Sequence, residues 1–92
     1  MAISSVPKTV RLEIDVPVLL FPENLNRRAF YARAYSGDVA LVKAADSTSN
    51  DGIWISKGPD GTFIDTVSAT DAWYAMAVGK PATVTTCEWT IV

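Results

Sequence analysis

Short runs of β-branched and aromatic residues recur along this sequence at intervals of roughly ten residues, and turn-forming residues separate them. The runs TVRLEID, RRAFYARAYS and ATVTTCEWTIV are examples. No stretch of about a dozen residues repeats its apolar positions at helical spacing between helix caps. The pattern predicts an all-β chain of about seven or eight strands, folded as a small antiparallel β-sandwich or jelly roll, with a barrel as the alternative.

Alternating side chains within two of these runs predict which face of each strand is buried, because successive residues of a strand point to opposite faces. In the first run, Val10, Leu12 and Ile14 are expected to face the core. In residues 27–36, one face is expected to carry Phe30, Ala32 and Ala34, and the other Tyr31, Arg33 and Tyr35.

Glycine-containing turns are expected to join consecutive strands. Residues 36–38 (SGD), 57–61 (KGPDG) and 79–81 (GKP) hold the Gly, Pro and Asp residues that tight turns favour. The first of these turns is expected to make a hairpin of the strands on either side of it, and the third to separate two strands in the same way.

The N-terminal region is expected to differ from the rest of the domain. Proline cannot donate a backbone hydrogen bond, so VPVLLF, with Pro17 and Pro22 at its margins, is predicted as an edge strand or a bent arm. The 92 residues are expected to form a single β domain over 1–92, in which residues 1–23 are an N-terminal arm or edge strands.

Subunit association is expected from the balance between chain length and apolar content. A chain of 92 residues buries only about 60–65% of its unfolded surface, and one cysteine, Cys87, cannot form a disulfide within the chain. Hydrophobic residues nevertheless make up 49% of the sequence, and VALV, WYAMAV and VPVLLF are apolar on both strand faces. A strand with one face in water should alternate apolar and polar residues, and these strands do not. A second layer supplied by a partner is therefore expected to cover them.

Catalytic and metal chemistry find little support in the sequence. The sequence has no histidine, the commonest general base. Without histidine, and with a single cysteine, it also lacks the ligands that a structural zinc site needs. We therefore expect no enzyme activity, no catalytic residues, no metal site and no cofactor. The loop around Asp46, Ser47, Asn50 and Asp51 offers oxygen ligands for calcium, but these residue types also dominate turns, and their spacing differs from that of the twelve-residue calcium loop.

The charge pattern bears on possible partners. A net charge of −2 argues against nucleic-acid binding as the main function. Residues 1–33 carry a net charge of +2, whereas the rest of the chain carries −4, an asymmetry that favours contact between the N-terminal region of one subunit and the acidic loops of another. No apolar stretch is long enough for a membrane span, and the first residues lack the layout of a signal peptide, so a soluble protein made in the cytosol is expected.

Two kinds of side chain are candidates for contacts with a ligand or partner. Trp54 stands beside the polar loop and is the candidate for stacking on a sugar, although aromatic residues in strands more often fill a core or an interface. Arg27 and Arg28 precede a strand directly, and their guanidinium groups suit bidentate pairing with a carboxylate of another chain. A solvated pair at the margin of the sheet is the alternative for these arginines.

The order of these elements resembles a known group. NLNRRAFYARAYS leads into two strands, SNDGIWIS places a glycine before a short strand, and DAWYAMAVGKPATVTTCEW closes the chain. Over residues 24–92 this is similar to the small β-domains of tailed-bacteriophage virion proteins, of the head decoration (cement) or head-fibre type. The resemblance implies a non-enzymatic capsid component on the virion surface that is made in the host cytoplasm.

The same resemblance implies partners, namely copies of the chain itself as a dimer or trimer and the major capsid protein. The residues expected to make these contacts are Leu19, Leu20, Phe21, Arg27 and Arg28. The alternatives are a carbohydrate- or receptor-binding module of a phage fibre, with Trp54 facing the ligand, and a tail or head adaptor protein.

Overall fold

A computed structural model describes residues 3–48, 50, 52–56, 58, 61–64 and 67–91, and of residues 3–6, 63, 67 and 68 it describes the backbone alone. Within these ranges the chain forms strands and short 3-10 turns. The elements are β1 (Ile3–Leu12), β2 (Val18–Phe21), β3 (Arg27–Val42), β4 (Ile53–Ile55), β5 (Thr62–Ile64), the 3-10 turn η2 (Val67–Thr70) and β6 (Trp73–Ile91). The prediction of an all-β, antiparallel domain is confirmed.

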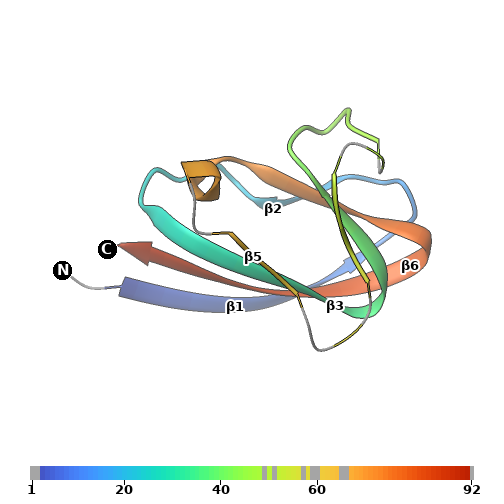
Figure 1. The fold of residues 1–92 in the computed structure, drawn as a ribbon, viewed down its shortest axis with the longest axis horizontal. Coiled ribbons are helices and arrows are strands. Elements are labelled where there is room, and N and C mark those ends of the chain that lie inside the picture. The colour runs from blue at the N-terminus through green and yellow to red at the C-terminus, as the bar shows by residue number, and fades with distance from the viewer. Residues whose placement is uncertain are drawn as a thin grey trace.

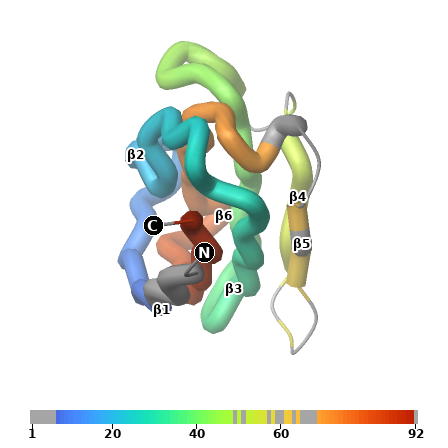
Figure 2. The backbone as a smooth tube through the Cα atoms, turned by 90° about the vertical axis from the view of Figure 1, so that its left-hand side faces the viewer, coloured from blue at the N-terminus to red at the C-terminus, as the bar shows by residue number. Residues whose placement is uncertain are grey.

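Two long strands organise the sheet. The 16-residue β3 and the 19-residue β6 pair with each other along nearly their whole length, from Arg27 opposite Thr90 to Val42 opposite Tyr74. Strands β1 and β2 both pair with the other edge of β6, and β4 and β5 both pair with the other edge of β3. Figure 2 shows β1 and β2 on one side of the molecule and β4 and β5 on the other.

Both long strands bend at the same place, so that one sheet folds back over itself. In Figure 1, β6 runs out along the top in orange and returns along the bottom in red. The lower half of the folded sheet contains β1, β5, residues 27–36 of β3 and residues 82–91 of β6. The upper half contains β2, β4, residues 38–42 of β3 and residues 73–78 of β6.

The bend occupies the positions where the sequence predicts turns. Ser36 faces Thr83 and Asp38 faces Val78, so Gly37 alone stands opposite the four residues 79–82 of β6. Gly37 has a φ of 72° and Gly79 a φ of 80°, a region of backbone space that glycine enters without a steric penalty. The predicted hairpin at 36–38 and the predicted separation of strands at 79–81 are therefore wrong, because each turn segment forms a bulge inside a continuous strand.

The core lies between the two halves of the sheet. Phe30, Ala32 and Ala34 from the lower half meet Val39 and Leu41 from the upper half, and none of these five side chains is exposed. The rings of Phe21 and Trp73 close one end of this core on the ring of Phe30, with centroid separations of 4.4 and 5.7 Å. The predicted faces of residues 30–35 are thus confirmed, as is the inward position of Leu12, whereas Ile14 is 42% exposed.

A second apolar cluster lies on the outer side of the upper half. Ala40, Val42 and Met76 are at most 1% exposed there, with Tyr74 and Val78 packed against them. The described residues that share a hollow with Met76 are Asp15, Ser47 and Thr48, from the segment after β1 and the loop after β3. The chain therefore covers both faces of VALV by itself, and the expectation that a partner is needed to cover this strand is wrong.

The N-terminal residues belong to the sheet. Strand β1 pairs with β6 from Ile3 opposite Ile91 to Leu12 opposite Ala82, and β2 continues along the same edge. Of the two alternatives for residues 1–23, the described part forms edge strands, because its backbone finds a full-length partner in its own chain.

Candidate functional site

Arg27 holds one end of the folded sheet together. It is 1% exposed, and its Nη1 donates hydrogen bonds to the carbonyl oxygens of Ala69 at 3.1 Å and Asp71 at 3.2 Å. Its Nη2 donates to the carbonyl of Pro22 at 2.6 Å, and its guanidinium carbon lies 5.1 Å from the centre of the Phe21 ring. A planar group with donors in several directions is suited to joining three separate backbone segments in this way.

The charge of Arg27 is balanced inside the same chain. Its Nε lies 3.5 Å from Oε2 of Glu88, whose side chain is 25% exposed. Nε makes no hydrogen bond with the described residues, so this contact is an ion pair without hydrogen-bond geometry. The expectation that Arg27 contacts a partner is wrong, because the side chain is buried and its acceptors belong to its own chain.

Two further predicted contact residues are also core residues. Leu20 and Phe21 are each 2% exposed and belong to the cluster between the two halves of the sheet. They cannot contact a partner while β2 stays paired with β6, so this part of the prediction is wrong. Leu19, Arg28 and Trp54 are exposed, Leu19 by 46% and Trp54 by 55%, and they remain available for contacts.

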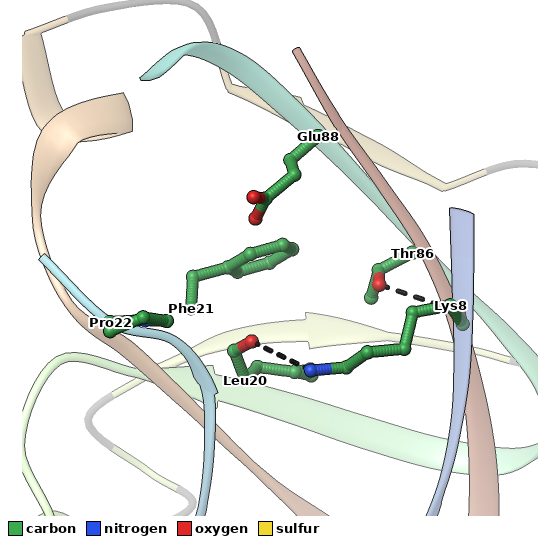
Figure 3. A pocket seen from close by; sticks show the side chains of 6 residues that line it. All are labelled: Lys8, Leu20, Phe21, Pro22, Thr86 and Glu88. Atoms are coloured by element: carbon green, nitrogen blue, oxygen red, sulfur yellow. Dashed lines mark hydrogen bonds between the residues drawn. The ribbon is translucent and has the colours of Figure 1, made fainter. Parts of the chain in front are cut away.

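A small pocket opens at the same end of the sheet (Figure 3). It measures about 180 Å³ and is lined by Lys8, Leu20, Phe21, Pro22, Thr86 and Glu88. Lys8 Nζ donates a hydrogen bond to the carbonyl of Leu20 at 3.2 Å, and Thr86 Oγ1 donates one to the carbonyl of Lys8 at 3.4 Å. The volume equals that of roughly six water molecules and lies below the range of about 300–1,000 Å³ that organic ligands need. This pocket is too small for a substrate site.

The outer sides of the two sheet halves are the larger candidate surfaces. The outer side of the lower half, here called the basic face, is built by the strand positions that alternate with the core residues. Its β6 residues Thr83, Thr85, Cys87 and Trp89 are each partly exposed, while Tyr35 of β3 is 64% exposed. The basic face carries Arg11, Tyr31, Arg33, Tyr35, Thr83, Thr85, Cys87 and Trp89.

The outer side of the upper half, here called the acidic face, surrounds the second apolar cluster. A hollow of about 350 Å³ lies there between Asp15, Ser47, Thr48 and Met76. The register places Trp54 beside Ala40, and Leu19 beside Tyr74, on this same face. The acidic face thus combines carboxylates with large apolar side chains, and consists of Asp15, Leu19, Asp38, Ser47, Thr48, Trp54, Tyr74, Met76 and Val78.

The segment carrying Asp15 is held firmly against β6. Ala77 donates its N–H to the carbonyl of Glu13 at 3.1 Å, and Asp15 donates its N–H to the carbonyl of Ala77 at 3.2 Å. Asp15 has a φ of 55°, which is uncommon for a residue other than glycine but is tolerated best by Asp and Asn. These two hydrogen bonds hold Asp15 beside the hollow. The sequence pattern does not predict this pairing with β6.

The described residues show neither a cluster of metal-ligating side chains nor a membrane-spanning helix. No three acidic or cysteine side chains gather closely enough there to hold a metal ion. In the loop that offers oxygen ligands for calcium, Asp46, Ser47 and Asn50 are described, whereas Asp51 lies outside the described residues. The same ranges contain no helix with the length and apolarity that a bilayer crossing requires.

Comparison with known proteins supplies a likeness of fold. No protein-family model matches the sequence, and no curated protein matches it. A solved structure, reported under the description "Bacillus endospore appendages form a novel family of disulfide-linked pili", is similar with a TM-score of 0.52. The two chains are 12% identical, and the likeness covers 98% of this chain and 89% of the other. The fold is therefore one that a pilus protein also uses.

Proposed function

We propose that this chain is a non-enzymatic structural subunit that works in an ordered assembly of its own copies. The observation that supports this most directly is the number of large apolar side chains left exposed on a domain of 92 residues. Exposed apolar surface gathered on one face of a small domain marks an interaction site, and Leu19 and Trp54 share the acidic face. The exposed residues are Ile14, Val16, Leu19, Leu25, Tyr35, Ile53 and Trp54.

Two settings for such an assembly are open to test. The resemblance of residues 24–92 to phage β-domains favours a capsid decoration protein that binds the major capsid protein and its own copies on the virion surface. The fold shared with a protein of disulfide-linked pili favours a filament. Both settings use the same physical mechanism, the burial of apolar surface between subunits, at about 25 cal/mol per Å² before the costs of association.

The experiment that tests the proposal is sedimentation velocity of the purified chain from micromolar to millimolar concentration, with negative-stain electron microscopy of the same samples. A closed dimer or trimer that binds purified phage capsids supports the decoration protein. Extended polymers support the filament. A chain that stays monomeric at every concentration and binds no capsid refutes the proposal.

Carbohydrate binding is the second candidate function, supported by the 55% exposure of Trp54 on a sheet face. An exposed indole ring offers an apolar face to a sugar ring. A glycan array screened with the wild-type chain and with Trp54→Ala tests this candidate. Binding that the substitution abolishes supports it, and an array without a hit refutes it.

A further inference from the structure

The two outer faces carry opposite charge. Arg11 and Arg33 are the charged side chains that the register places on the basic face, and among the described residues of that face there is no carboxylate. Asp15 and Asp38 are the charged side chains of the acidic face, which has no lysine or arginine among its described residues. Glu13, which follows β1 directly, pairs with Arg11 at 3.6 Å and offsets part of its charge, so Arg33 carries most of the basic character of this face.

The fold aims these faces in opposite directions. The inner sides of the two sheet halves meet around the core, so their outer sides point away from each other (Figure 1). A copy of the chain therefore presents a basic surface at one side and an acidic surface at the other. Such a molecule is complementary to the next copy in a stack, and complementary potentials give an interface its orientation.

We propose that the acidic face of one copy docks on the basic face of the next, with Arg33 of one copy beside Asp15 and Asp38 of the other. This inference rests on the proposed function and names the surfaces that the assembly uses. Tyr35, 64% exposed and two residues from Arg33, protrudes from the basic face and suits the hollow of about 350 Å³ on the acidic face. Tyrosine and arginine are among the side chains most enriched at the centres of protein interfaces.

The charges also decide against a symmetric dimer. A two-fold contact between basic faces would bring Arg33 toward Arg33, and one between acidic faces would bring Asp38 toward Asp38. Juxtaposed like charges disfavour both arrangements. A contact between unlike faces leaves one free face of each kind at the ends of the stack, so it continues as an open filament unless the rotation between copies closes a ring.

A charge-exchange experiment at low salt tests the docking of the two faces. Arg33→Glu and Asp38→Lys are each expected to weaken self-association at least about tenfold, because either change sets like charges against each other. An equimolar mixture of the two variants, and the double variant, are each expected to associate more strongly than either single variant alone, because both restore an unlike pair at positions 33 and 38, although Asp15 still faces the introduced glutamate. Glu23→Lys, in an exposed loop, makes the same change of charge as Asp38→Lys away from both faces and is expected to have no effect.

The possible results separate the inference from the proposed function. If the wild type assembles and the single variants assemble equally well, or if the double variant does not recover, the docking of unlike faces is refuted while self-assembly stands. An effect of Arg33→Glu without any effect of Asp38→Lys shows that Arg33 contacts a surface other than the acidic face and also refutes it. A wild type that never associates refutes the proposed function itself. Circular dichroism of each variant verifies the fold, and the milder Asp15→Asn and Arg33→Gln replace any variant that unfolds.

Discussion

Replacement of Arg27 by methionine is expected to destabilise the domain severely. The change removes three hydrogen bonds from a charged donor to the carbonyl oxygens of Pro22, Ala69 and Asp71. It also leaves the Glu88 carboxylate, only 25% exposed, without the cation beside it. Removing one partner of a buried ion pair costs about 3–5 kcal/mol, because the groups left behind have lost their water as well as their partner.

This loss is large compared with the stability of the whole domain. At about 0.05–0.15 kcal/mol per residue, a domain of this length has a free energy of unfolding of roughly 5–14 kcal/mol. With a urea m-value of about 1 kcal/mol per M for a small domain, the unfolding midpoint is expected to fall by about 3 M or more. Trp73, which is 5% exposed in the core, provides the fluorescence signal.

The controls for this measurement lie in the same neighbourhood. Arg28→Met makes the same chemical change at an exposed position and is expected to alter stability by no more than about 0.5 kcal/mol. Glu88→Gln keeps the carbonyl acceptors of Arg27 and is expected to cost about 1 kcal/mol. All variants are compared at one protein concentration, because association of the native state adds stability. If Arg27→Met is as stable as Arg28→Met, the assignment of Arg27 as the group that holds this end of the sheet is wrong.

Three further predictions address the bend, the core and the exposed tryptophan. Gly37→Ala is expected to lower the free energy of unfolding in urea more than Gly79→Ala does. Both substitutions place alanine at a positive φ, which costs about 1–2 kcal/mol. Only at Gly37 would the new Cβ also lie 3.0 Å from neighbouring atoms. Leu20→Ala is expected to destabilise by about 2–5 kcal/mol and Leu19→Ala by less than about 1 kcal/mol; equal costs would show that β2 is not packed as described. Acrylamide is expected to quench the tryptophan fluorescence of Trp54→Phe less strongly than that of the wild type, because the substitution removes an exposed indole. An unchanged quenching constant would contradict the exposure of Trp54.

The sequence predicts the β class and the faces of residues 30–35 because both depend on local alternation, which the fold does not override. It fails for Arg27 because the carbonyl acceptors of this side chain in and after η2 are 42 and 44 residues away along the chain. No local pattern reports such a contact. A buried arginine and a solvated one look the same in a single sequence.

For VALV, the argument from apolar content fails for a different reason. It treats a strand that is apolar on both faces as evidence for a partner, since one small domain rarely has a second layer to spare. Here the segment around Asp15 and the residues near Ser47 share the hollow above Met76, and Met76 is 1% exposed. Loops and strand connections can cover a sheet face as well as a subunit can, so only exposure measured on the folded chain identifies the surface left for partners.

The bend itself could be predicted from the phase of the hydrophobic pattern. In β3 the buried core positions change from even numbers, ending at Ala34, to odd numbers, beginning at Val39. A three-residue hairpin at 36–38 would pair Tyr35 with Val39 and Arg33 with Leu41, and so place a guanidinium group on the same face as two core residues. A bulge avoids this conflict, because it changes the phase of the alternation without reversing the chain.

The second long strand makes the same change at the matching place. In β6 the buried core positions change from odd numbers, ending at Ala77, to even numbers, beginning at Ala82. Gly37 faces this segment, so the two strands change phase together and keep one continuous set of core residues. The bend also sends Arg33 and Asp38 to opposite sides of the molecule. It therefore converts part of the charge asymmetry along the chain into the two oppositely charged faces on which head-to-tail docking depends.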